Sequence, residues 1–140
     1  MTTTNGERLV LASKSAARRA MLTDAGVPFA VQVADVDEDA LKTPGVDPVE
    51  LAVELARAKA LAVSRHDADA WVLGADQTLS FEGGLVSKAP TLQAARERLS
   101  AMRGRSHQLH SGAALARNGQ VVWSGVDTVE VKVRDFSDAF

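Results

Sequence analysis

Lys59 carries a positive charge where the local pattern asks for an apolar side chain. The run Asp47-Pro48-Val49-Glu50 is a strong helix start. At about 100° per residue, Lys59 lies nearly opposite Arg57 and beside Leu55 on the apolar stripe of that helix. A buried ammonium costs free energy unless it reaches water or an anion. Lys59 therefore either extends to solvent at the helix edge or binds an anion, and its removal is not expected to lower stability.

Arg18 repeats this anomaly in an earlier helix, predicted over residues 16–25 with Ser15 as its cap. Arg18 shares a stripe with Met21 and Leu22, and it lies in the first turn, where the helix dipole disfavours a cation. An anion bound at this helix start would remove both objections. The hydroxyls of Ser13 and Ser15 and the Arg18 guanidinium would then converge on a phosphate.

Acidic residues supply the second kind of chemistry. Asp76 directly follows an apolar run over 71–75, which we predict to be a buried strand that ends at Asp76. Catalytic and metal-binding groups often follow strands in this way, although an ordinary turn is the alternative for a single Asp. Residues 35–39 hold four acids, which form either a solvated loop or oxygen ligands for Mg²⁺. Lys88, before Pro90, is expected to be a further phosphate contact.

These residues need an α/β domain with a mixed sheet to position them. Helices alternate with strands, and Asn118-Gly119 is a strong hairpin signal between two long strands. The expected strands cover residues 8–13, 29–34, 71–75 and 129–133, the expected helices cover 16–25, 47–65 and 91–104, a hairpin turn is expected at 82–84, and a further helix is expected to begin at 135–137.

Composition excludes several classes of protein. A length of 140 residues indicates one domain, and the absence of Cys excludes disulfides and thiolate sites. A net charge of −2 and 4% aromatic residues argue against nucleic acid as a partner. We find no long apolar run and no secretory signal, so we expect no membrane partner and a cytoplasmic location. Phosphate-loop, dinucleotide-binding and H-E-x-x-H motifs are absent from the sequence.

Six short motifs, in order, carry a resemblance to a known family. They are LASKSAARRAML at 11–22, VDE at 36–38, LARAKA at 55–60, LGADQT at 73–78, SKAP at 87–90, and RGRSH at 103–107 followed by Ser111-Gly112. Together they resemble the Maf (septum-formation) family of nucleotide pyrophosphatases. The resemblance implies an elongated mixed sheet flanked by helices with a central cleft, as in inosine triphosphate pyrophosphatases.

The resemblance also implies an activity and a site. Such proteins split nucleoside triphosphates into monophosphate and pyrophosphate with a divalent metal, Mg²⁺ or Mn²⁺. They are linked to the exclusion of modified nucleotides and to arrest of septum formation. Asp76 would be the proton acceptor and a metal ligand, and Glu38 would hold the metal or orient water. The triphosphate would be held by Ser13, Arg18, Lys59 and Lys88.

The chain departs from the family pattern at positions that bear on the base. Ala16 and Ala17 replace the usual Pro and first Arg. Gln77 stands where the dTTP and UTP branch usually has Thr, and it is more like the 7-methyl-GTP branch. That branch usually has Trp where this chain has Ala17. Gln77 is therefore expected to bind substrate and to select the base. The alternatives are a nucleotide or anion sensor without turnover and a metal-dependent nucleotidyltransferase.

The C-terminal motifs of the family, K-A-G-x-Y-x-x-Q-G and G-L-P, do not occur in residues 1–140. We therefore expect a single Maf-like domain that is incomplete at its C-terminal end, so that either a longer protein or a partner covers the exposed sheet. The chain by itself is expected to be weakly active and to self-associate as a homodimer.

Overall fold

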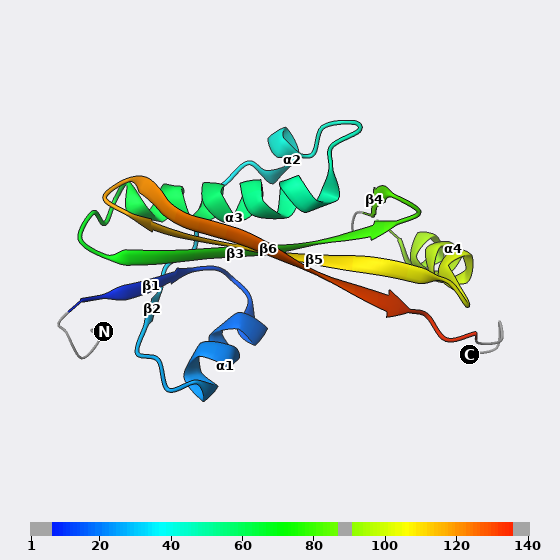
Figure 1. Ribbon diagram of the computed structural model, residues 1–140, viewed down its shortest axis with the longest axis horizontal. Coiled ribbons are helices and arrows are strands. Elements are labelled where there is room, and N and C mark those ends of the chain that lie inside the picture. Colours follow the sequence, from blue (N-terminus) through cyan, green and yellow to red (C-terminus); the bar gives the residue numbers. More distant parts are fainter. Residues whose placement is uncertain (1–6, 87–90, 136–140) are drawn as a thin grey trace.

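The computed structural model describes residues 7–86 and 91–135, which form a mixed six-stranded sheet with helices on both faces (Figure 1). The strands are β1 (Leu9–Ala12), β2 (Ala30–Val31), β3 (Trp71–Phe81), β4 (Gly84–Val86), β5 (Ser106–Arg117) and β6 (Gln120–Lys132). The three long strands β3, β5 and β6 run the length of the molecule, and β5 is antiparallel to both of the others. The order across the sheet is β2-β1-β3-β5-β6, and β4 pairs with β3. The predicted mixed α/β sheet is confirmed.

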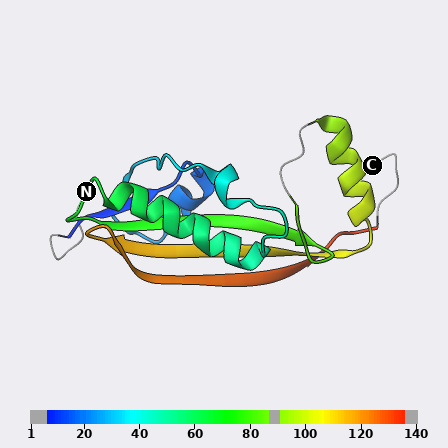
Figure 2. The ribbon, with the colours of Figure 1, turned by 90° about the horizontal axis from the view of Figure 1, so that it is seen from above.

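Side-chain caps start the three longer helices where the sequence predicts them. The side chains of Ser15, Asp47 and Thr91 each accept a hydrogen bond from a backbone N–H in the first turn. The helices are α1 (Ala16–Asp24), α2 (Glu38–Leu41), α3 (Pro48–Ser64) and α4 (Leu92–Met102). α3 lies along one face of the sheet and α1 lies on the other, while α4 stands at the far end (Figures 1 and 2).

Small residues let α3 lie directly on the sheet. A Cβ atom at Gly74 would lie 2.2 Å from the backbone oxygen of Ala56, and one at Gly112 would lie 2.3 Å from that of Ala52. The core beneath this contact contains mostly small and β-branched side chains, namely Val10, Ala12, Ala56, Ala60, Val63, Ala70, Val72, Ala114 and Ala116. The backbone of α3 is thus held at a fixed height above β3 and β5.

Two predicted strands have the wrong extent. The strand predicted over 29–34 contains only Ala30–Val31, because β2 is an edge strand that pairs with β1 alone among the described strands. β3 does not end at Asp76 but continues to Phe81. It continues because β5 pairs with it up to Ser80, although β1 leaves it at Gly74 and β4 joins it only at Leu79. Asp76 therefore lies in the middle of a strand, between its two short neighbours.

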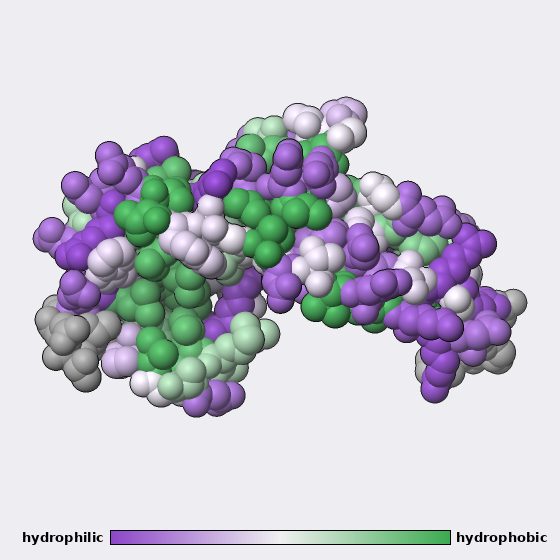
Figure 3. All heavy atoms as spheres, viewed as in Figure 1, coloured by the Kyte–Doolittle hydropathy of each residue, from purple (hydrophilic) through white to green (hydrophobic). Residues whose placement is uncertain are grey.

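One edge of the sheet presents apolar side chains to solvent. Val122, Trp123 and Val129 on β6 are each more than half exposed, and hydrophobic residues gather on this face of the molecule (Figure 3).

Within the described residues, no helix has both the length and the apolar composition needed to cross a membrane.

We expect the chain to self-associate through β6, because an exposed apolar edge strand is a template for pairing with a second copy. Trp123→Lys should shift the molar mass measured by light scattering toward the monomer, while Lys132→Gln on the same strand should leave it unchanged. A wild-type chain that stays monomeric at high concentration would contradict this expectation.

Candidate active site

Three elements bring one cation and two carboxylates together. Lys59 on α3 places its Nζ 2.9 Å from Oδ2 of Asp76 on β3 and 3.6 Å from Oε1 of Glu38 at the start of α2. The side chains of Lys59 and Asp76 are 17% and 14% exposed, whereas that of Glu38 is 44% exposed. Lys59 therefore contacts two other residues that were predicted for the site, Asp76 and Glu38.

Lys59 and Arg57 lie on opposite sides of α3, as the helical projection predicts. Arg57 donates from Nη1 to Oε1 of Glu54 at 2.7 Å and from Nη2 to Oγ of Ser124 at 2.9 Å. The anions that Lys59 meets are protein carboxylates, which the projection did not identify. The effect of removing Lys59 on stability stays a prediction, and the structure adds that Asp76 would lose the ammonium beside it. Leaving a buried acceptor without a partner costs about 1–3 kcal/mol.

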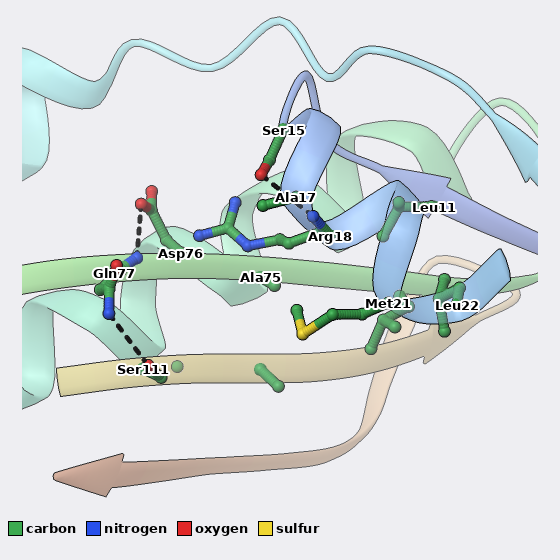
Figure 4. A pocket seen from close by; sticks show the side chains of 13 residues that line it. Leu11, Ser15, Ala17, Arg18, Met21, Leu22, Ala75, Asp76, Gln77 and Ser111 are labelled. Carbon is green, nitrogen blue, oxygen red and sulfur yellow. Dashed lines mark hydrogen bonds between the residues drawn. The ribbon is translucent and has the colours of Figure 1, made fainter. Parts of the chain in front are cut away.

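The loop before α1 holds Arg18 in place. Oγ of Ser13, which is 5% exposed, accepts hydrogen bonds from the backbone N–H of Ser15 at 3.0 Å and from Nη1 of Arg18 at 3.3 Å. Ser13 therefore positions the guanidinium, and its own contact with a phosphate stays a prediction. The sequence suggested that the stripe of Arg18 and Met21 faces the core. None of the nine residues of α1 is buried, so the stripe does not face the core. It faces a cavity instead (Figure 4).

That cavity, of about 350 Å³, lies between α1 and the sheet and has mostly apolar walls. A polar hollow of about 300 Å³ lies beside it, lined in part by Ser13, Lys14 and Lys59. Both are lined by Ser15 and Arg18. A third hollow, of about 340 Å³, shares Asp76 and Gln77 with the apolar cavity and Glu38 with the polar one. The three spaces therefore meet around Arg18 and Asp76, and the Arg18 guanidinium extends toward Asp76 (Figure 4).

Gln77 and Ser111 form a polar pair on the wall of the apolar cavity. They are direct cross-strand partners of β3 and β5, and Nε2 of Gln77 donates to Oγ of Ser111 at 3.4 Å. The backbone N–H of Gln77 also donates to Oδ1 of Asp76 at 2.7 Å. Sequence reasoning singled out Gln77 but gave Ser111 no role of its own. The signal was the strand register, which requires knowing how β3 and β5 pair.

The two carboxylates fit a divalent cation that brings other ligands with it. The buried Oδ2 of Asp76 accepts no hydrogen bond from the described residues, although the ammonium lies beside it. Mg²⁺ is usually held by one or two carboxylates, waters and substrate phosphates. Within residues 7–86 and 91–135, no three His, Asp or Glu side chains gather as a metal site. The donor set therefore fits a cation shared with a phosphate ligand. Lys88 lies outside the described residues.

Sequence comparison relates the chain to known proteins. The family model described as Maf-like protein matches residues 8–140. A nucleoside triphosphate pyrophosphatase of Maricaulis maris (strain MCS10) is 48% identical over 135 residues, covering 95% of this chain and 69% of the relative. A 7-methyl-GTP pyrophosphatase of Rhizobium meliloti (strain 1021) is 43% identical over 136 residues, covering 94% of this chain and 68% of that protein.

A solved structure supports the fold alone. The HAM1 protein from Coxiella burnetii aligns with a TM-score of 0.51 at 18% sequence identity, covering 89% of this chain and 70% of that chain. The elongated α/β architecture is thus shared by a protein with a very different sequence. The match over nearly the whole described chain, together with relatives above 40% identity, shows that this chain belongs to the family of Maf-like proteins.

Proposed function

We propose that the chain is a nucleoside triphosphate pyrophosphatase, which hydrolyses a triphosphate to the monophosphate and pyrophosphate. One observation carries this proposal. Asp76 and Arg18 both line the apolar cavity, and the Asp76 carboxylate contacts Lys59, which lines the neighbouring polar hollow together with Arg18. The site thus has an apolar part beside a part that is lined by cations. A nucleotide has a matching arrangement, with the base at one end and the anionic phosphates at the other. The names of the related pyrophosphatases support the same reaction.

The base would occupy the cavity beneath α1, whose volume of about 350 Å³ is typical of a small-ligand site. The phosphates would lie in the polar hollow, where Arg18 and Lys59 supply positive charge and Ser15 caps the start of α1. Ser13 would hold Arg18 in position through its hydrogen bond to Nη1. The predicted contact of Lys88 with the triphosphate belongs to the same proposal.

Asp76 would act as the general base. A water oxygen attacks the α-phosphorus, the bond from that phosphorus to the oxygen bridging to the β-phosphate breaks, and pyrophosphate leaves. The carboxylate of Asp76 accepts the proton from the water. Arg18 and Lys59 stabilise the negative charge that develops on the phosphoryl oxygens. A divalent cation, Mg²⁺ or Mn²⁺, held by Asp76 and Glu38 would neutralise phosphate charge when bound.

A screen for pyrophosphate release tests this function. Ordinary and modified nucleoside triphosphates are incubated with the chain in the presence of Mg²⁺ or Mn²⁺. Release of pyrophosphate from at least one triphosphate is the expected result. Triphosphate binding without release from any of them would favour a sensor, and release only in the presence of an acceptor would favour a nucleotidyltransferase. The roles in excluding modified nucleotides and in septum arrest stay predictions, as does the cytoplasmic location.

Gln77→Thr is expected to change base preference without stopping the reaction. The Gln77 amide offers a donor and an acceptor at the wall of the apolar cavity, so its loss changes which base edge is fully paired. The measurement is the ratio of kcat/KM values for purine and pyrimidine triphosphates, in which a general loss of activity cancels. Ratios that stay constant would place specificity elsewhere.

A further inference from the structure

Lys59 makes its ion pairs with the two carboxylates that would hold the cation. Its Nζ is 2.9 Å from Oδ2 of Asp76, the same oxygen that accepts no hydrogen bond from the described residues. It is also 3.6 Å from Oε1 of Glu38. A divalent cation bound by these oxygens and an ammonium placed between them would repel each other strongly. Both cannot occupy this position together.

The fold allows the ammonium to move but holds the backbone of Lys59 still. Ala56 and Ala60 on the same helix are fully buried, and they pack against Gly74 on β3. Lys59 itself has a flexible four-carbon stem. Its side chain also lines the polar hollow shared with Ser13 and Arg18. The ammonium can therefore reach either the carboxylates or a phosphate in that hollow without any shift of α3.

We propose that Lys59, besides contacting the phosphates, competes with the divalent cation for Asp76 and Glu38. In the free protein its ammonium holds the two carboxylates and weakens cation binding. When nucleotide phosphates enter the hollow, the ammonium turns to them and the carboxylates become available to the cation. This inference rests on the proposed function, because it takes a triphosphate as the ligand of the hollow. Nucleotide and cation then strengthen each other's binding by the same factor.

Binding of Mn²⁺, followed by electron paramagnetic resonance without nucleotide, tests the competition directly. Lys59→Met should bind Mn²⁺ more tightly than the wild type by about tenfold, since a cation is removed from the two carboxylates. Arg57→Met is the matched control, because it removes a cation from the same helix on the side of Glu54 and Ser124. It should leave the affinity for Mn²⁺ unchanged. Circular dichroism checks folding, and Lys59→Gln replaces Lys59→Met if the latter does not fold.

A non-hydrolysable triphosphate analogue provides the second arm. It should raise the Mn²⁺ affinity of the wild type by a larger factor than that of the Lys59 variant, whose carboxylates are already free. An Mn²⁺ affinity of the Lys59 variant equal to or below that of the wild type would overturn the proposal, and is what a merely structural lysine predicts. The measured quantity is the affinity for Mn²⁺, which does not require the protein to hydrolyse a nucleotide. Failure of the wild type to release pyrophosphate would therefore contradict the proposed function without deciding the competition.

Discussion

Asp76→Asn is expected to abolish pyrophosphate release while the chain stays folded. The substitution keeps the size of the side chain but removes the proton acceptor, which by itself costs about 10²–10⁴-fold in rate. It also removes a negative charge next to Lys59 and one oxygen donor for the cation. The measurement is the initial rate of pyrophosphate release, with circular dichroism to show that the sheet is intact.

Asp69→Asn is the control for this substitution. Asp69 is an exposed acid in the turn before β3 and lines none of the three hollows. Its replacement by Asn changes the net charge by the same amount as Asp76→Asn. It should retain the rate of the wild type. If Asp76→Asn also retained that rate, Asp76 would have no part in the chemistry and the proposed mechanism would be wrong.

Gly74→Ala is expected to destabilise the fold more than any other single change considered for this chain. The new methyl group would lie 2.2 Å from the backbone oxygen of Ala56 and 2.7 Å from the backbone nitrogen of Ala60, so α3 must lift from the sheet. Overpacking costs about 1–3 kcal/mol and occasionally more, and a clash with rigid backbone belongs at the upper end of that range. Because α3 also carries Lys59, activity should fall with stability.

Urea denaturation followed by circular dichroism measures this loss as a lower unfolding midpoint. Gly84→Ala is the matched control, since a methyl group at Gly84 would meet nothing closer than the backbone oxygen of Phe81 at 3.7 Å. That change should be neutral or slightly stabilising, because alanine restricts the unfolded chain. Equal midpoints for the two variants would show that α3 does not need the close approach at Gly74.

Local signals in the sequence predicted the elements whose boundaries depend on neighbouring residues. Ser15, Asp47 and Thr91 start helices because their side chains satisfy nearby backbone N–H groups. The hairpin at Asn118-Gly119 forms because both residues adopt positive φ, at 55° and 73°. These features need no knowledge of the rest of the fold, and the sequence analysis placed them correctly.

Features that depend on distant parts of the chain could not be predicted in this way. The extent of β3 beyond Asp76 depends on its pairing with β5, which lies far along the sequence. The partners of Lys59 depend on the register that brings Asp76 beneath α3, so the projection identified an unusual cation but not its carboxylates. The absence of buried residues in α1 likewise reflects the cavity beside it, which a helical stripe cannot distinguish from a core.

Product analysis by ³¹P NMR, with a triphosphate that the screen identifies as a substrate, tests the central claim most directly. The account predicts that the triphosphate signals of a reaction with the wild type are replaced by those of nucleoside monophosphate and pyrophosphate in equal amounts, and that Asp76→Asn leaves the triphosphate intact. Orthophosphate and nucleoside diphosphate as the products, or pyrophosphate released equally well by Asp76→Asn, would contradict it.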